Sequence, residues 1–267
     1  MGYLANFNHV ILGKGAKKLV FLHGLMGYGL NWRTLAKEFE ADFEILLFDQ
    51  RGHGKSFQPS SGYAPEDYAD DLNKILNELQ WQKIFLVGHS MGGRNALNFA
   101  YRFPACVDRL VIEDIGPESD PAGEKSIREL IEIVPVPFRK KEDARDFFQK
   151  DFSKLYKGPE NARTIGLFLY SNLEGEPGNI RWRFSLPGIL ESVRLGRVSD
   201  RWHEVKALTM PTLVIRGEKS KDLSQKNYEQ MIACNPNIQG VIISGAGHWA
   251  HADKPKEVAQ ALKDFLS

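Results

Sequence analysis

A strand, a sharp turn and a helix follow one another in residues 83–94, which read KIFLVGHSMGGR. The apolar residues at the start are typical of a buried strand, and the turn would place Ser90 between that strand and the helix. Such a turn is crowded, and glycine at Gly88 and Gly92 removes the side chains that would clash. This context favours a nucleophilic Ser90 over a purely structural glycine-serine turn.

A nucleophilic serine needs a base that takes its proton and an acid that orients the base. Of the seven histidines, His248 lies in the glycine-flanked loop Gly245–Trp249, between the last expected strand and the last expected helix. Such a loop can bring an imidazole over the serine. His251 is the rival, but it leads into a helix start at Asp253, so we expect His248 to be the base.

Two aspartates compete for the role of the orienting acid. Asp222 follows the expected strand that ends at Arg216, but with Gln225 three residues later it forms a capping-box pattern, which predicts a helix N-cap. Asp114 follows the expected strand that ends at Glu113, and no helix pattern begins there. The sheet would place that strand end beside the serine turn. We therefore expect Asp114 to be the acid and keep Asp222 as the alternative.

The negative charge that develops on an attacked carbonyl oxygen requires backbone N–H donors. Met91 supplies one donor at the start of the helix. The stretch after the apolar run Leu19–Leu22 reads HGLMG, in which Gly24 and Gly27 let the backbone turn its N–H groups inward. We expect Leu25 to be the second donor, with a plain turn between strand and helix as the alternative.

Short apolar runs alternate with amphipathic helical patterns along most of the chain. Near-continuous apolar strands separated by helices are typical of a parallel sheet covered on both faces. The sequence therefore predicts an α/β fold with a mostly parallel, doubly wound sheet and an antiparallel edge strand at 8–12. The other expected strands are Leu19–Leu22, Glu44–Phe48, Lys83–Val87, Leu110–Glu113, Leu213–Arg216 and Gly240–Ile243, and the expected helices are Trp32–Phe39, Pro65–Leu79, Arg94–Arg102, Asp222–Cys234 and Pro255–Leu266.

This alternation stops between Gly116 and about Leu208. No convincing strand occurs there, but helical patterns cover Ala122–Val134, Glu142–Tyr156, Glu160–Leu173 and Leu186–Leu195. Aromatic side chains on these patterns, such as Phe168, must pack on the main domain or on each other, or roof an apolar pocket. We expect an α/β core of residues 1–116 and 208–267, with residues 117–207 as a helical cap.

The overall composition gives no sign of a nucleic-acid-binding or membrane-spanning protein. The 267 residues are 42% hydrophobic with a net charge of +1, which allows a sizeable core and gives no electrostatic reason to bind nucleic acid. No apolar run approaches the roughly 18 residues of a spanning helix, and no signal peptide is visible. The two cysteines are far apart, so we expect free thiols, no metal site and a cytoplasmic protein.

Together these motifs resemble the α/β-hydrolase superfamily over essentially the whole chain. The resemblance is carried by residues 23–24, 49–54, 88–93 and 247–248. It implies a cap inserted after strand 6 of the fold and a triad of Ser90, His248 and an acid. In that family the acid usually follows the seventh strand, at the position that Ser220 occupies here. Some members carry it after strand 6 instead, which is where Asp114 falls.

A narrower resemblance, carried by residues 181–186 and 217–220, is to small bacterial hydrolases of acyl esters and thioesters. It implies a carboxylesterase-like enzyme that forms an acyl-enzyme on a small ester or thioester and needs no metal or cofactor. Arg183, Trp249 and Phe168 are the candidate substrate-binding residues. A C–C bond hydrolase or lyase, using Arg94 or Arg183 as a cation, and a ligand receptor with slow turnover are the alternatives.

Overall fold

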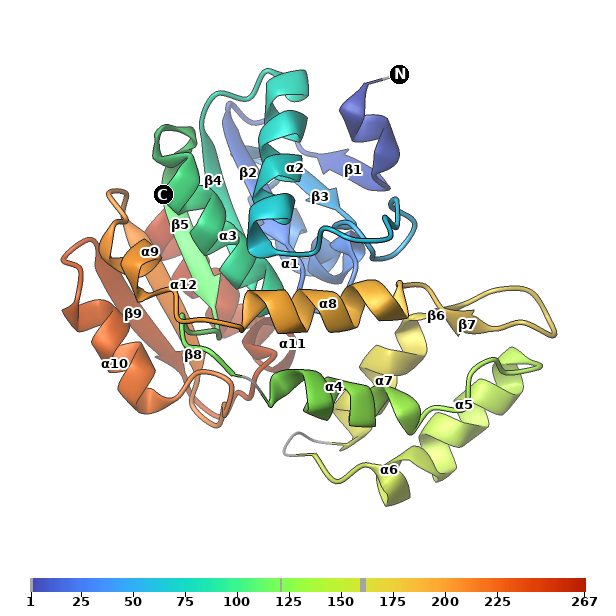
Figure 1. Cartoon of the computed structure of the whole chain (residues 1–267). Coiled ribbons are helices and arrows are strands. Elements are labelled where there is room, and N and C mark those ends of the chain that lie inside the picture. Colours follow the sequence, from blue (N-terminus) through green and yellow to red (C-terminus); the bar gives the residue numbers. More distant parts are fainter. Residues whose placement is uncertain (1, 121, 159–161) are drawn as a thin grey trace.

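The computed structural model describes residues 2–120, 122–158 and 162–267, and a seven-stranded sheet forms its centre (Figure 1). The strands of this sheet are β1 (His9–Leu12), β2 (Lys17–Leu22), β3 (Phe43–Phe48), β4 (Ile84–His89), β5 (Val107–Glu113), β8 (Thr212–Gly217) and β9 (Ile238–Ile243). Their spatial order is β1-β3-β2-β4-β5-β8-β9. β1 pairs antiparallel with β3, and the other neighbouring pairs of this sheet are parallel. The predicted α/β fold with an antiparallel edge strand is confirmed.

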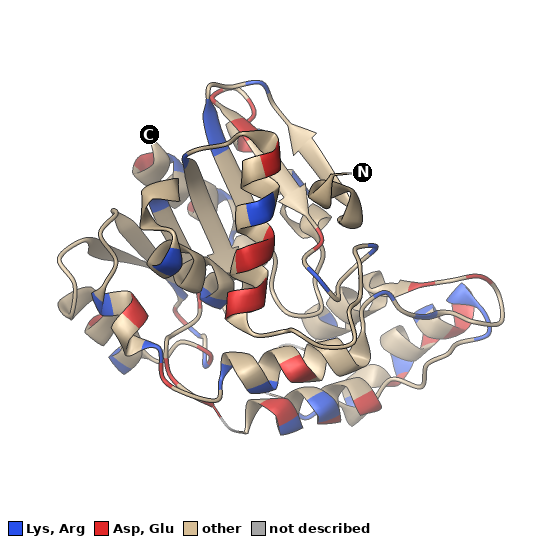
Figure 2. Cartoon of the chain, turned by 45° about the horizontal axis from the view of Figure 1, so that its top comes forward, with Lys and Arg blue, Asp and Glu red and all other residues tan. Residues whose placement is uncertain are grey.

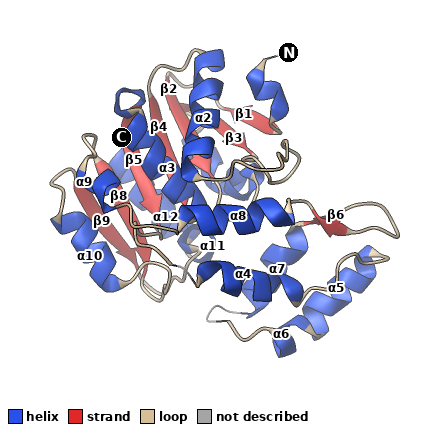
Figure 3. Cartoon of the chain, viewed as in Figure 1, coloured by secondary structure: helices blue, strands red, loops and turns tan. Residues whose placement is uncertain are grey.

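Helices cover both faces of the sheet, as Figure 3 shows. One face carries α2 (Pro65–Leu79), α3 (Met91–Arg102), α9 (Trp202–Lys206) and α10 (Gln225–Ala233), and the other carries α1 (Arg33–Ala36), α11 (Ala250–Asp253) and α12 (Pro255–Leu266). Side chains of a strand point alternately to the two faces. In β2, Val20 and Leu22 join the core under α2 and α3, whereas Leu19 and Phe21 join the core under α1 and α12. The strands read as continuous apolar runs because both faces are buried.

The segment between β5 and β8 is largely helical. It contains α4 (Gly123–Glu132), α5 (Lys141–Lys150), α6 (Phe152–Leu155), α7 (Ala162–Ser171) and α8 (Leu186–Gly196). Figure 1 shows these helices gathered on one side of the molecule, beyond the ends of the sheet strands. They share an apolar cluster in which Ile131, Phe152, Leu169 and Ile189 are buried. Much of the aromatic surface predicted for this segment therefore packs within it.

The same segment departs from the sequence predictions in one respect. Two short strands, β6 (Leu173–Glu174) and β7 (Arg181–Trp182), form a small antiparallel sheet where no strand is expected, because two-residue strands carry no periodic pattern. The segment follows β5, the strand that ends just before Asp114, which is where the resemblance places the insertion. The helix expected from Glu160 would begin outside the described residues, and its described part is α7.

Two helices of the α/β core also differ from expectation. The pattern over Trp32–Phe39 predicts one helix, but the chain forms two 3-10 turns, Gly29–Trp32 and Lys37–Phe39, on either side of the short α1. α10 begins at Gln225 instead of at Asp222. α2, by contrast, has the predicted ends, and its first residue is a proline, whose fixed φ suits the start of a helix.

Figure 2 shows Lys and Arg residues interspersed with Asp and Glu residues along the chain, and α4 carries residues of both signs side by side. This mixing agrees with the small net charge of the sequence. No helix among the described residues is long and apolar enough to cross a membrane. Cys106 and Cys234 are free thiols, as predicted.

Candidate active site

Ser90 lies in the turn between β4 and α3, and its backbone φ of 54° is a conformation that non-glycine residues rarely adopt. The turn is crowded by backbone atoms. A Cβ on Gly88 would overlap the carbonyl oxygen of Gly92, and a Cβ on Gly92 would overlap the carbonyl oxygen of Leu22. Both glycines are therefore required by close backbone contacts, as the sequence predicts.

The structure brings Ser90, His248 and Asp114 together from three distant parts of the chain. Nε2 of His248 lies 3.0 Å from Ser90 Oγ, and Nδ1 of the same ring lies 2.8 Å from Asp114 Oδ2. All three residues are buried, and Asp114 is buried completely. In this arrangement one nitrogen of the imidazole can accept the serine proton while the carboxylate holds the other nitrogen.

The last residue of β8 and the loop that follows it hold the carboxylate of Asp114. The backbone N–H of Gly217 donates to its Oδ1 at 2.9 Å, and the hydroxyl of Ser220 donates to its Oδ2. Burial raises the pKa of Asp114, and the contacts with His248, Ser220 and Gly217 oppose this shift only in part. Ser220 thus occupies the position where the resemblance would place an acid, and it donates a hydrogen bond to the acid candidate that follows β5.

Asp222 is not the N-cap of α10, so this prediction is wrong. Ser224 caps the helix instead, and its hydroxyl accepts from the backbone N–H of Asn227. The actual cap lies two residues after the predicted one, because Ser224 is itself a good capping residue. Oδ2 of Asp222 lies 3.5 Å from Nδ1 of His248, so the alternative acid also lies next to the imidazole.

His251, the rival base, pairs with Glu113. Its backbone N–H donates to Glu113 Oε1 at 2.8 Å, and its Nδ1 lies 2.9 Å from the same oxygen. His89 lies nearby, and its Nε2 donates to the carbonyl oxygen of His248 at 2.9 Å. Burial lowers the pKa of His89 well below its ordinary value. His89, Glu113 and His251 bring potential metal-ligand atoms within 4.8 Å of one another, but hydrogen bonds already engage these side chains.

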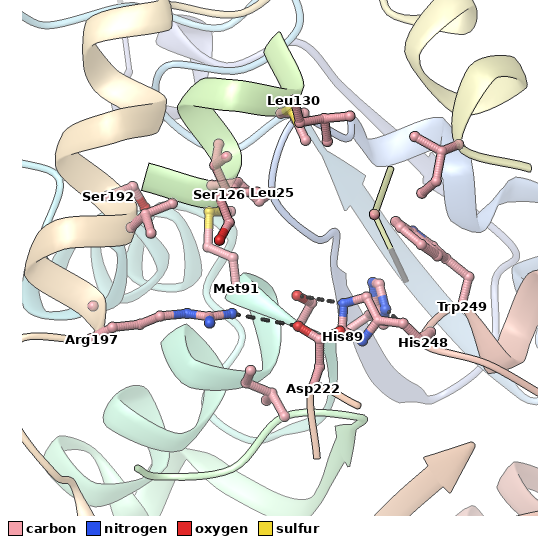
Figure 4. Close-up of a pocket in the computed structure, with 18 of the residues that line it drawn as sticks. Leu25, His89, Met91, Ser126, Leu130, Ser192, Arg197, Asp222, His248 and Trp249 are labelled. Carbon is pink, nitrogen blue, oxygen red and sulfur yellow. Dashed lines mark hydrogen bonds and ion pairs between the residues drawn. The ribbon is translucent and has the colours of Figure 1, made fainter. Parts of the chain in front are cut away.

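A cavity of about 530 Å³ opens onto Ser90 and His248 (Figure 4). Its walls come from both the α/β core and the segment between β5 and β8. Apolar side chains form much of the lining, namely Met26, Ile115, Ile127, Leu130, Ile133, Ile165 and Val193, with a smaller polar set of Ser126, Ser192, Arg94, Arg197 and Asp222. A concave, largely apolar site with a few polar groups is typical of small-molecule binding.

Leu25 and Met91, the expected oxyanion donors, both line this cavity. Met91 is the first residue of α3, so its backbone N–H has no acceptor within the helix. The loop that carries Leu25 lies beside the serine, because a Cβ on Gly24 would lie 3.4 Å from the Cβ of Ser90. Both backbone segments are therefore near the place where a substrate carbonyl would meet Ser90.

The three candidate substrate-binding residues lie in different places. Trp249 lines the cavity at Ser90 and also a second cavity of about 970 Å³. Phe168 lines only the second cavity, with its ring 5.7 Å from the ring of Trp249. Arg183 lines neither of these two cavities. Its guanidinium lies over the ring of Tyr28 at 4.6 Å, which ties the helical segment to the core.

Two arginines bring positive charge to the cavity at Ser90. Arg94 is buried and donates to two backbone carbonyl oxygens at 2.6 Å, and burial lowers its pKa to about 9. Arg197, at the C-terminal end of α8, pairs with Asp120 at 2.5 Å and lies 3.8 Å from Asp222. Sequence reasoning misses Arg197, because a basic residue at the end of a helix is common and usually only favours the helix dipole.

Comparison with known proteins relates the chain to a family. The profile of a family described as alpha/beta hydrolase fold matches residues 17–255. The sn-1-specific diacylglycerol lipase ABHD11 of Danio rerio is 33% identical over 264 residues, which cover 95% of this chain and 80% of the lipase. Among solved structures, a marine microorganism esterase has a TM-score of 0.83 at 27% identity, covering 97% of this chain and 98% of its own. E-2-(acetamidomethylene)succinate hydrolase has a TM-score of 0.84 at 26% identity, covering 97% and 94%. The chain therefore belongs to the α/β-hydrolase fold family, as a hydrolase that resembles esterases.

Proposed function

We propose that this chain hydrolyses carboxylic esters or thioesters through Ser90, His248 and Asp114. One observation carries the proposal: the imidazole of His248 lies 3.0 Å from Ser90 Oγ and 2.8 Å from Asp114 Oδ2, beside a largely apolar cavity. The compared relatives support it, because a lipase and an esterase are among them. Residues 117–207 act in this proposal as the cap that closes the cavity.

Acylation begins when the substrate carbonyl reaches Ser90. His248 takes the serine proton as Oγ attacks the carbonyl carbon, and Asp114 keeps the imidazole in the tautomer whose Nε2 can accept that proton. The backbone N–H groups of Leu25 and Met91 donate to the oxyanion. One such donor is typically worth about 10²–10³ in kcat.

Collapse of the tetrahedral intermediate breaks the bond to the leaving group. The alcohol or thiol departs with the proton held by His248, and the acyl group stays on Ser90. A water molecule then gives a proton to His248 and attacks the acyl-enzyme, and a second collapse releases the acid and restores the serine. Side chains, backbone N–H groups and water perform every step.

The test of this proposal is hydrolysis of p-nitrophenyl esters of increasing acyl length, with Ser90→Ala as the control. We expect turnover that depends on Ser90 and peaks at one acyl length, because a bounded apolar cavity of about 530 Å³ favours one chain size. No turnover at any length by a correctly folded protein would contradict the proposal.

A second candidate is cleavage of a C–C bond in a substrate that carries a carboxylate. The positive charges of Arg94 and Arg197 at the same cavity favour it. The likeness to a hydrolase whose substrate is named as a succinate derivative also agrees with an anionic substrate. If the protein cleaves a diketone acid in a reaction that depends on Ser90, and hydrolyses no neutral ester, C–C bond cleavage would be the favoured function.

A further inference from the structure

Two carboxylates approach the same nitrogen of His248. Asp114 Oδ2 lies 2.8 Å from Nδ1, and Asp222 Oδ2 lies 3.5 Å from it. At 2.8 Å Asp114 accepts a hydrogen bond, whereas 3.5 Å is too long for a good one, so Asp222 acts on the imidazole mainly through its charge. The side chain of Asp222 is 30% exposed and that of Asp114 is fully buried. The two carboxylates are therefore not equivalent.

Asp222 also faces a cation from the helical segment. Its Oδ1 lies 3.8 Å from Nη2 of Arg197, while Nη1 of the same guanidinium pairs with Asp120 at 2.5 Å. Figure 4 shows Asp222 between Arg197 and the imidazole of His248, with one carboxylate oxygen toward each. The carboxylate of Asp222 thus lies between the guanidinium of Arg197, at the end of α8, and the imidazole of His248.

We propose that Asp222 and Arg197 are a positioning pair that tunes His248: Asp222 stabilises the protonated imidazole, and Arg197 limits that stabilisation. The inference rests on the proposed function, in which His248 is the general base. A base that holds its proton too strongly is unavailable for Ser90 at neutral pH. Arg197 belongs to the helical segment between β5 and β8, so a residue outside the α/β core helps to set the working pH range of the enzyme.

Other charged or titratable side chains surround this pair. They are Asp114 after β5, His89 in β4, Arg94 in α3, Asp120 before α4, and the Glu113–His251 pair. The ring of His89 lies 4.7 Å from that of His248, but its lowered pKa keeps it neutral at neutral pH. All of these groups are retained when Asp222 or Arg197 is replaced, so a comparison of those variants isolates the pair.

The direction of each effect follows from the sign of the charge. Asp222→Asn removes a negative charge that favours the imidazolium, so the acid limb of the kcat/KM profile moves to lower pH. Arg197→Gln removes the positive charge that offsets the carboxylate of Asp222, so Asp222 stabilises the imidazolium more strongly and the limb moves to higher pH. Because Arg197 acts through Asp222, Arg197→Gln adds little further shift once Asp222 is asparagine.

The experiment measures two rates from acidic to alkaline pH: kcat/KM for p-nitrophenyl butyrate, and covalent labelling of Ser90 by a fluorophosphonate. We expect the acid limb to shift by about half a pH unit in opposite directions for Asp222→Asn and Arg197→Gln, since Asp222 is partly exposed and its charge partly screened. The acid limb of the double variant, Asp222→Asn with Arg197→Gln, should lie close to that of Asp222→Asn alone. Acid limbs that coincide in the wild type and all three variants would overturn the inference.

Asp120→Asn is the matched control, because it removes the other partner of Arg197 and keeps the contact with Asp222. It should not move the acid limb to higher pH. An upward shift equal to that of Arg197→Gln would trace the effect to a loosened α8 and would overturn the inference. Thermal unfolding establishes that each variant is folded.

Labelling also separates the two proposals. A wild type that is labelled at Ser90 but hydrolyses no ester would contradict ester hydrolysis. The pH dependence of its labelling rate would still test the role of Asp222 and Arg197. A folded wild type that is not labelled would contradict both.

Discussion

Nδ1 of His248 lies 2.8 Å from Oδ2 of Asp114, although 134 positions separate the two residues in the chain. β5 lies between β4 and β8 in the sheet, so the residue that follows it is adjacent to the serine turn after β4 and to the loop after β8. The backbone N–H of Asp114 donates to the carbonyl oxygen of Ile215 in β8 at 2.8 Å. The sheet itself therefore fixes the position from which this carboxylate reaches the imidazole.

This geometry predicts unequal effects for the two aspartates. Asp114→Asn should lower kcat/KM by about 10³–10⁴-fold, because an amide neither favours the required tautomer nor stabilises the imidazolium. Asp222→Asn should lower kcat/KM by less than about tenfold. The carboxylate of Asp222 accepts no hydrogen bond from the His248 ring, because the two lie 3.5 Å apart. Steady-state kinetics with a p-nitrophenyl ester gives the ranking. The reverse ranking would assign the acid role to Asp222.

The contrast between these aspartates shows which features the sequence could reveal. The serine turn could be predicted because strand, glycines and helix are local patterns that one stretch of chain contains. The choice of Asp114 depended on which strand ends are neighbours, and the fold class supplied that information. Asp222 was only the alternative acid, because its local pattern favoured an N-cap, a role that Ser224 takes.

For a similar reason, the contacts between the helical segment and the α/β core could not be predicted from the sequence. Arg183 stood out because its surroundings resembled a known stretch, yet it contacts Tyr28 and Glu174 outside both cavities. Arg197 lines the cavity at Ser90, although nothing in its local sequence marks it. Contacts of this kind depend on how helices pack on the core, and amphipathic patterns do not specify that packing.

Ser90→Ala should abolish turnover without changing the fold. We expect kcat/KM to fall by about 10⁵–10⁶-fold, since the attacking oxygen is lost. The Ser90 side chain lies within hydrogen-bonding distance of His248 Nε2 at 3.0 Å, and loss of one such contact changes stability by only about 1 kcal/mol. Kinetics and thermal unfolding on the same preparation check both parts. Near-normal activity in the folded variant would end the proposal that Ser90 is the nucleophile.

Two glycine variants test the crowding at the serine turn. Gly92→Ala places a Cβ 2.6 Å from the carbonyl oxygen of His23, so we expect a loss of about 1–3 kcal/mol in the free energy of unfolding. Gly196→Ala is the control: its Cβ would meet nothing closer than Pro65 at 4.0 Å, and it should stabilise by about 0.5 kcal/mol. Denaturant unfolding measures both. Equal stability of the two variants would mean that the turn can relax around the added methyl group.

The buried His23 predicts that the protein loses stability in mild acid. The backbone N–H of Gln50 donates to its Nε2 at 2.9 Å, and its Nδ1 donates to the carbonyl oxygen of Gly24 at 2.8 Å, so the folded state requires the neutral ring. Burial lowers the pKa of His23 to about 4. The unfolded chain, with a histidine pKa near 6.5, binds the proton that the folded state excludes, so stability falls as the pH drops between these values.

The measurement is the free energy of unfolding at several pH values below neutrality. His23 alone should remove about 1.4 kcal/mol per pH unit once the pH is below the unfolded pKa. His23→Asn keeps a polar side chain but does not titrate, so it should reduce the slope by about that amount even if it lowers stability overall. A slope that is the same in the wild type and His23→Asn would show that other groups cause the acid sensitivity.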